Sequence, residues 1–244
     1  MRRIHITLLV AAAFGACNDG VQSPRDRDPN VLFSGGLTPS GSSLFGVIHC
    51  VNYVSATDSQ DVVFVNALIG GDSTADSVWF EGIYLPETIT SKDSASRVYQ
   101  RSYTINSSPF ALDGSYYTFA VGGDWGGGSF ADSLQSPTSR VTITSPGYGD
   151  TVSASGFTVT WVPSGGKAII WLHDTVQGEH PCGTRLIETN TGTATLSSSD
   201  LSCLASGSIW LTVTAGNAKV DSIGSGAYYS IVVRSEMRIR LHLD

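Results

Sequence analysis

The chain has 244 residues and a formal net charge of −7, with 41% apolar but only 14% charged residues. This acidic balance leaves too little positive charge to neutralise phosphates, which excludes non-specific binding of nucleic acid. The 27 glycines and the abundance of Ser, Thr, Val and Tyr favour extended strands and tight turns. No amphipathic helical window of eleven or more residues follows the first twenty residues, so we predict an all-β protein.

The first sixteen residues have the parts of a secretory signal peptide. Arg2 and Arg3 form a basic start, an apolar run covers 4–14, and small residues precede Cys17. This run is too short to span a bilayer as a stable helix, and no second transmembrane stretch follows. Export therefore fits better than a membrane span.

The residues Phe14-Gly15-Ala16-Cys17 resemble the bacterial lipobox, in which an aliphatic and two small residues precede a cysteine that becomes lipidated. Phe14 departs from the usual Leu of that pattern. The resemblance implies a lipoprotein of the bacterial cell envelope, anchored through Cys17 on the periplasmic face or at the cell surface. The alternative is ordinary secretion after cleavage near Ala11-Ala12-Ala13.

The segment that follows, 17–40, is dominated by Pro, Asp, Arg, Ser and Gly. Such a composition cannot bury enough apolar surface to fold, so we predict a flexible tether. From there to Ser136, strand-like segments recur about every ten residues with turn residues between them, as in a β-sandwich. The strands expected in this first domain, 41–137, cover 44–54, 61–69, 77–85, 97–105 and 116–121.

Two segments resemble immunoglobulin-like and fibronectin type III domains. LDGSYYTFAV (112–121) resembles their tyrosine corner, with Tyr117 at the start of the next-to-last strand. A plain glycine turn before an aromatic strand is the alternative. VTWVP (159–163) resembles the second strand of the family, with its core Trp161 and a proline two residues later.

The second resemblance implies a seven-stranded sandwich over 138–235. Its strands are expected at 141–143, 151–161, 168–172, 184–189, 193–197, 208–215 and 227–233. We therefore predict two tandem immunoglobulin-like β-sandwich domains. The end of the chain, 236–244, alternates apolar and basic residues and is expected either to extend the last strand or to add an edge strand.

Three cysteines remain after Cys17. Cys182 and Cys203 fall in the same predicted domain, each just ahead of a strand, and we expect them to form a disulfide. Cys50 lies within an apolar strand and is expected to be a buried free thiol.

Two segments contain side chains of the types that catalysis uses. The stretch from His173 to Cys182 holds metal-capable side chains but lacks the ligand spacing of a zinc site, so a polar loop is favoured. Gly71-Asp72-Ser73 resembles the nucleophile motif of GDS-type esterases, but no Asp-x-x-His occurs near the C-terminus and a strand, not a helix, follows. We expect no catalytic residue, no metal and no cofactor.

Aromatic residues offer the remaining candidate site. Trp125 stands in the glycine-rich stretch 122–128, where it would stack on a sugar ring or meet a partner, or else fold back over the sandwich. Trp79, Trp161 and Trp210 are expected in the core, and the place of Trp171 is left open. The sequence thus favours a non-catalytic binding or structural module with a protein or polysaccharide partner. A glycan-binding accessory module that uses exposed aromatics is the alternative, and a secreted hydrolase is the third hypothesis.

Overall fold

The computed structural model describes residues 43–55, 62–70, 77–90, 96–104, 108–123, 129–174, 183–187, 190–223 and 227–244. Within these ranges the chain is built from strands, apart from the single helical turn α3 (Ser198–Leu201). The prediction of an all-β protein is confirmed. Among the helices in the described part of the chain, none is long and apolar enough to cross a membrane.

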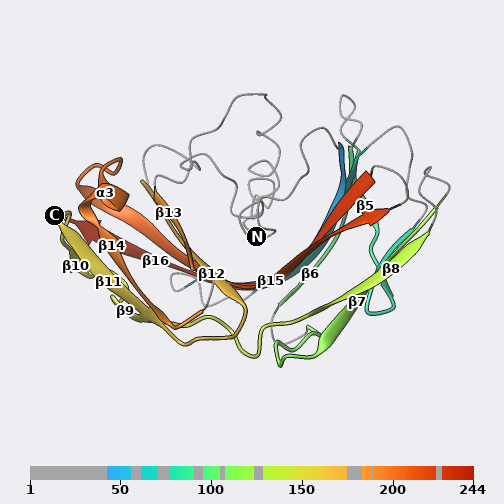
Figure 1. Cartoon of the computed structure of the whole chain (residues 1–244), viewed down its shortest axis with the longest axis horizontal. Coiled ribbons are helices and arrows are strands. Elements are labelled where there is room, and N and C mark those ends of the chain that lie inside the picture. Colours follow the sequence, from blue (N-terminus) through green and yellow to red (C-terminus); the bar gives the residue numbers. More distant parts are fainter. Residues whose placement is uncertain are drawn as a thin grey trace, which may run out of the picture.

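One large sheet runs through the whole molecule (Figure 1). Its strands follow the order β13-β12-β15-β16-β1-β2-β6-β5, and β10 pairs with one end of β16. β1 and β10 run parallel to β16, and the other neighbours are antiparallel. The strands are β1 (Ser43–Ser55), β2 (Val62–Gly70), β5 (Glu87–Thr90), β6 (Ser96–Thr104), β10 (Thr151–Val152), β12 (Lys167–Asp174), β13 (Gly183–Ile187), β15 (Gly207–Ile223) and β16 (Ala227–Leu243).

Two small sheets lie on the convex side of the large one, one near each end (Figure 1). The first has the order β4-β3-β7-β8, and the second has the order β14-β11-β9. Their strands are β3 (Ser77–Phe80), β4 (Ile83–Tyr84), β7 (Tyr116–Gly122), β8 (Phe130–Gln135), β9 (Ile143–Ser145), β11 (Gly156–Trp161) and β14 (Thr193–Ser197). Each small sheet and the part of the large sheet that it covers form a β-sandwich.

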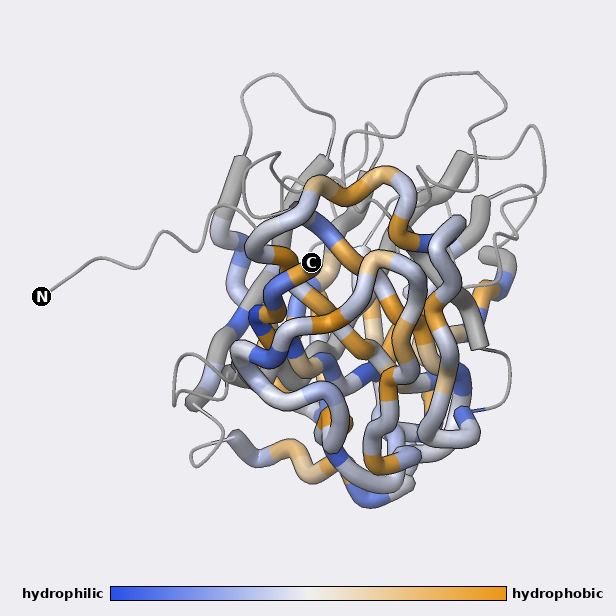
Figure 2. The backbone as a smooth tube through the Cα atoms, turned by 90° about the vertical axis from the view of Figure 1, so that its left-hand side faces the viewer, coloured by the Kyte–Doolittle hydropathy of each residue, from blue (hydrophilic) through white to orange (hydrophobic). Residues whose placement is uncertain are grey.

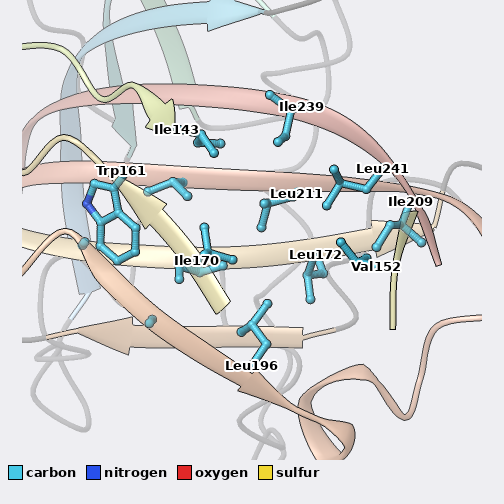
Figure 3. Close-up of a cluster of buried hydrophobic side chains, with 14 of the residues drawn as sticks. Ile143, Val152, Trp161, Ile170, Leu172, Leu196, Ile209, Leu211, Ile239 and Leu241 are labelled. Atoms are coloured by element: carbon cyan, nitrogen blue, oxygen red, sulfur yellow. The ribbon is translucent and has the colours of Figure 1, made fainter. Parts of the chain in front are cut away.

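Each sandwich encloses its own hydrophobic core. The first core joins β2, β3, β6, β7 and β16, and Phe80 and Phe119 lie at its centre with no exposed surface. The second core joins β9, β10, β11, β12, β14, β15 and β16, and Figure 3 shows its side chains meeting between the two sheets. Seen from the side of this unit, hydrophobic and hydrophilic stretches alternate along the strands (Figure 2). That alternation is the pattern of strands buried on one face.

The two sandwiches share the strands β15 and β16. In β16, Tyr229, Ile231 and Val233 belong to the first core, whereas Ile239 and Leu241 belong to the second. The predicted division at 137/138 therefore separates the two small sheets, while the large sheet continues through both units. The final residues up to Leu243 continue β16.

The connection between the small sheets is fastened to the middle of the large sheet. The Val141 amide donates a hydrogen bond to Ser235 Oγ at 2.9 Å. The Asn217 side-chain amide donates to the Gln135 carbonyl at 2.8 Å. The acceptor Ser235 lies on β16 and the donor Asn217 lies on β15, which are the shared strands. The two units are therefore joined by more than a linker.

Tyr117 makes the contact that the tyrosine-corner resemblance implied. Its ring is buried in the first core, and its hydroxyl donates a hydrogen bond to the Ala111 carbonyl six residues upstream. Beside it, Phe80 lies edge-on to Tyr117 and to Phe110, with ring centroids 5.3 Å and 4.5 Å away. This aromatic cluster supports the first small sheet from beneath.

Candidate binding surface

The outward face of the sheet β4-β3-β7-β8 carries three exposed aromatic side chains. Trp79 is 40% exposed, Tyr84 39% and Tyr116 66%. They face outward because β3 and β7 alternate strictly, with Val78 and Phe80 turned into the core on either side of Trp79. Three large aromatics on one sheet face are unusual, since isolated exposed apolar residues are normal but a gathered set marks an interaction surface.

Trp79 and Tyr84 act as one unit. They are cross-strand neighbours, and their rings meet edge-on with centroids 5.4 Å apart. The two-residue turn between them, Glu81-Gly82, has φ values of 49° and 73°, the positive values that a tight hairpin of this kind requires. Arg101 Nε donates to the Tyr84 carbonyl at 2.7 Å and so fixes the short strand β4 from the side. The pair is therefore held in place by backbone contacts.

Tyr116 lies at a distance from this pair along the same face. Trp79 is registered with Ala120 on β7, and Tyr116 stands four residues away on that strand. At about 3.3 Å per residue, this places Tyr116 about 13 Å along the strand from the position beside Trp79. The aromatic face is thus extended in one direction rather than gathered at a point.

Between the aromatics the strand positions carry polar but uncharged side chains. Thr118 and Ser133 are registered with each other, and Gln135 is registered with Tyr116. All three side chains are exposed. Glu81, in the turn, uses its carboxylate to accept a hydrogen bond from the Thr118 amide. No outward position within these four strands carries a charged side chain.

An ionic cluster fixes this small sheet to the large one. Lys219 Nζ of β15 lies 2.7 Å from Asp132 Oδ2 of β8, and the Tyr229 hydroxyl donates to the same oxygen at 2.6 Å. Burial alone would raise the pKa of Asp132, but the hydrogen bonds from Lys219 and Tyr229 outweigh it, and the pKa is lowered. The hydrogen bond with Asp132 raises the pKa of Lys219, and burial followed by Asp132 raises that of Tyr229. These shifts favour a carboxylate, an ammonium and a neutral phenol at neutral pH.

The residues predicted as sites lie mostly outside this surface. Cys17, Trp125 and Cys182 fall outside the described residues. Cys203 follows α3 and is disulfide-bonded, and its pairing with Cys182 stays a prediction. The side chain of Cys50 in β1 is also outside the description, so its predicted state is not tested.

The tryptophans expected in the core divide into two groups. Trp161 is buried in the second core, and its indole N–H donates to Asn190 Oδ1 at 2.7 Å. Trp79 and Trp210 were predicted wrongly: Trp79 is exposed, and Trp210 lies on the face of β15 opposite to the buried Ile209 and Leu211. A period of two shows that a strand has two faces but does not show which face is buried.

The residues considered for catalysis are not brought together in the described part of the chain. His173 is 7% exposed and stacks on Trp171 with centroids 5.5 Å apart. The side chains of Asp174, of 179–180 and of Ser73 are outside the description. Within the described residues, no group of three or more His, Cys, Asp or Glu side chains is placed to hold a metal ion.

The similarities of the chain to known proteins are to solved structures. No family model and no curated protein matches it. Among solved structures it is similar to the full ectodomain (Ig1–Ig3) of mouse nectin-like molecule 4, with 12% identity and a TM-score of 0.24 over 83% of this chain and 65% of that one. It is also similar to the FN1–FN3 domains of chicken CNTN1, with 14% identity and a TM-score of 0.22 over 71% and 60% of the two chains.

The chain spans less than two thirds of the length of either structure. Both are composed of domains of the classes that the sequence resembles. At these TM-scores and identities, nothing about function follows from the likeness. The assignment of sandwich units rests on the sheets and cores described above.

Proposed function

We propose that this chain is a non-catalytic binding module that holds a neutral polysaccharide on the outward face of β4-β3-β7-β8. One observation carries the proposal: Trp79, Tyr84 and Tyr116 are exposed together on a sheet face without charged side chains. Large aromatics give much contact area with few rotatable bonds, which makes them favourable for binding.

A polysaccharide fits the shape and polarity of this face. The C–H faces of a sugar ring pack on an aromatic ring, and the ring edges bear hydroxyl groups. Thr118, Ser133 and Gln135 offer donors and acceptors between the aromatic positions. An extended row of about 13 Å suits several consecutive sugar units better than one small molecule. The strands of this face carry no charged side chain and the adjoining turn carries the Glu81 carboxylate, which favours a neutral chain over an acidic one.

We also propose that the module is held at a bacterial membrane. The support is the lipobox-like Phe14-Gly15-Ala16-Cys17 and the polar composition of 17–40. A lipid on Cys17 and a tether of this kind would keep the aromatic face away from the membrane surface and open to a polysaccharide of the envelope.

Affinity electrophoresis tests the binding function. The protein is run in native gels that contain hydroxyethyl cellulose, xylan or glucomannan, beside the variants Trp79→Ala, Tyr116→Ala and Tyr148→Ala. Tyr148 is 52% exposed but belongs to the second unit, so it is the matched control. We expect at least one polysaccharide to retard the parent chain, Trp79→Ala to lose about tenfold or more in affinity, and Tyr148→Ala to behave like the parent.

Three results would contradict the proposal. Retardation that persists in both Trp79→Ala and Tyr116→Ala would move the binding site elsewhere, and absence of retardation by every polysaccharide would remove the neutral glycan as ligand. Release of reducing ends during incubation would contradict the non-catalytic part.

A further inference from the structure

Glu81, in the turn beside the aromatic face, has a backbone conformation that glutamate seldom adopts. Its φ is 49°, and every other residue with a positive φ in the described part of the chain is a glycine. The first central position of such a two-residue hairpin turn favours Asn, Asp or Gly, which tolerate this region more easily than other residues. A glutamate held there is strained, and strained residues gather at binding and catalytic sites. The geometry of the turn alone therefore does not account for a glutamate at this position.

The ladder between β3 and β7 places Glu81 between the two ends of the aromatic face. Trp79 is registered with Ala120, and the Glu81 amide donates to the Thr118 carbonyl at 2.9 Å, so Glu81 lies opposite Thr118. Tyr116 stands two residues further along β7. At about 3.3 Å per residue, Glu81 is about 7 Å along the strand from Trp79 and about 7 Å from Tyr116. A polysaccharide packed on both aromatics would pass over the row of Glu81.

One carboxylate oxygen of Glu81 is engaged and the other is open. Oε1 accepts a hydrogen bond from the Thr118 amide, a donor that an uninterrupted ladder would pair with a backbone carbonyl. Glu81 is exposed, and among the described residues no other hydrogen bond and no ion pair engages its carboxylate. A carboxylate has about four lone-pair sites. The hydrogen bond from Thr118 thus holds the group in place, while Oε2 is available to a ligand.

We propose that Glu81 determines the specificity of the aromatic face, its Oε2 accepting hydrogen bonds from the hydroxyl groups of the sugar unit between those packed on Trp79 and Tyr116. This inference rests on the proposed function and deepens it. Hydrogen bonds to a charged acceptor are about twice as strong as those between neutral groups. The same negative charge repels the carboxylate of a uronate placed there. Glu81 therefore strengthens the binding of a neutral chain and selects against an acidic one.

Two replacements separate this role from the support that Glu81 gives to the turn. Glu81→Gln keeps the length of the side chain and an Oε1 acceptor for the Thr118 amide, so the thermal midpoint is expected to stay unchanged while the charge is lost. Glu81→Asn introduces a residue that the turn prefers, but with a shorter and neutral side chain. Glu87→Gln is the matched control, because it removes the same charge from an exposed position of the same unit, on the large sheet.

Calorimetric titration of the full chain with cellohexaose, xylohexaose, mannohexaose and hexagalacturonate tests the inference. We expect the parent chain to bind at least one neutral hexamer and to bind hexagalacturonate more weakly. For that neutral hexamer, Glu81→Gln and Glu81→Asn are expected to lose about fivefold in affinity, and Glu87→Gln to match the parent. Glu81→Gln is expected to gain affinity for hexagalacturonate. The preference for the neutral chain then falls in the Glu81 variants and not in the control.

The outcomes distinguish a failure of this inference from a failure of the proposed function. Parent-like binding of the neutral hexamer by Glu81→Gln or by Glu81→Asn would overturn the inference, because the carboxylate would then not contact the ligand. An equal loss in Glu87→Gln would overturn it too, since the effect would come from overall charge. If Trp79→Ala lost affinity in the same titration and Glu81→Gln did not, the proposed function would stand without the inference. No binding of any neutral hexamer by the parent chain would remove both.

Discussion

Gly216 of β15 lies directly opposite Arg234 of β16, and the two backbones approach so closely that no side chain fits between them. A Cβ on Gly216 would lie 2.7 Å from the Arg234 Cα and 2.3 Å from the Val233 carbonyl oxygen. Ala215, just before it, belongs to the second core, and Val233 belongs to the first. The shared strands thus pass from one sandwich to the other at a position that requires glycine.

Replacing Gly216 by Ala is therefore expected to destabilise the chain. The new methyl group would meet backbone atoms, which yield less than the end of a side chain, so we expect a loss of about 2 kcal/mol or more in the free energy of unfolding. Urea unfolding followed by circular dichroism measures it. Gly147→Ala is the control, because there a Cβ would meet only the Asp150 side chain at 3.3 Å. A loss at Gly216 no larger than at Gly147 would contradict the close packing.

Because β16 contributes to both cores and β15 pairs with it along its whole length, the two sandwiches are expected to unfold together. Calorimetry should give a single transition with a van't Hoff enthalpy close to the calorimetric enthalpy. Two tandem domains that are merely linked would give separate transitions. A pair of resolved peaks would contradict the coupling through the shared strands.

Asp132→Asn is expected to lower the free energy of unfolding, by an amount that depends on pH. The carboxylate accepts hydrogen bonds from Lys219 and Tyr229, and losing a charged partner costs about 1–3 kcal/mol at pH 7. The pKa of Asp132 is lowered by folding, so its contribution is present above its unfolded value of about 4 and is lost as the pH falls through the lower folded value. The pKa of Lys219 is raised by folding. Its contribution to the free energy of unfolding is therefore present below its unfolded value and is lost as the pH rises above about 10.

Denaturant unfolding of the parent chain and of Asp132→Asn between pH 3 and 11 checks this. The difference in free energy should be largest near neutrality and shrink toward both extremes. Asp244→Asn, an exposed change at the last residue of the chain, is the control and should show no such profile. A difference that is constant from pH 3 to 11 would contradict the ionic cluster.

The lipid anchor can be tested by mass. The protein extracted from membranes of a bacterial host is expected to start at Cys17 and to be heavier by a diacylglyceryl group and an acyl chain. Two missing protons would report a disulfide such as Cys182–Cys203. An unmodified chain that starts elsewhere would contradict the anchor and leave a diffusible protein.

Much of the fold was predictable because the strands alternate strictly. The expected segments 116–121 and 193–197 are the observed β7 and β14 to within a residue. β8 (Phe130–Gln135) was missed because its inward positions include the charged Asp132, which breaks the apolar alternation. The extent of β15 was underestimated because Gly216-Asn217 has the composition of a turn. In the folded chain these two residues are the crossing point between the cores.

The candidate surface was predictable only in part. Trp125 was the candidate for an aromatic binding site, with folding back over the sandwich as the alternative, and it lies outside the described residues. The exposed aromatics of the described part are Trp79, Tyr84 and Tyr116 on one sheet face. The signal was present in β7, since the buried Tyr117 and Phe119 leave Tyr116 and Thr118 facing outward. The position of Tyr84 beside Trp79 depends on a hairpin register that one sequence does not reveal.

The binding function is tested most directly by the indole N–H signals of the protein in solution. The five tryptophans give five such signals, which single replacements assign. On titration with the neutral oligosaccharide of a polysaccharide that retards the chain, we predict that the Trp79 signal shifts in proportion to saturation, while the signal of the buried Trp161 stays in place. An unchanged Trp79 signal at saturation would contradict the account, because the ligand would then be bound away from the exposed aromatic face.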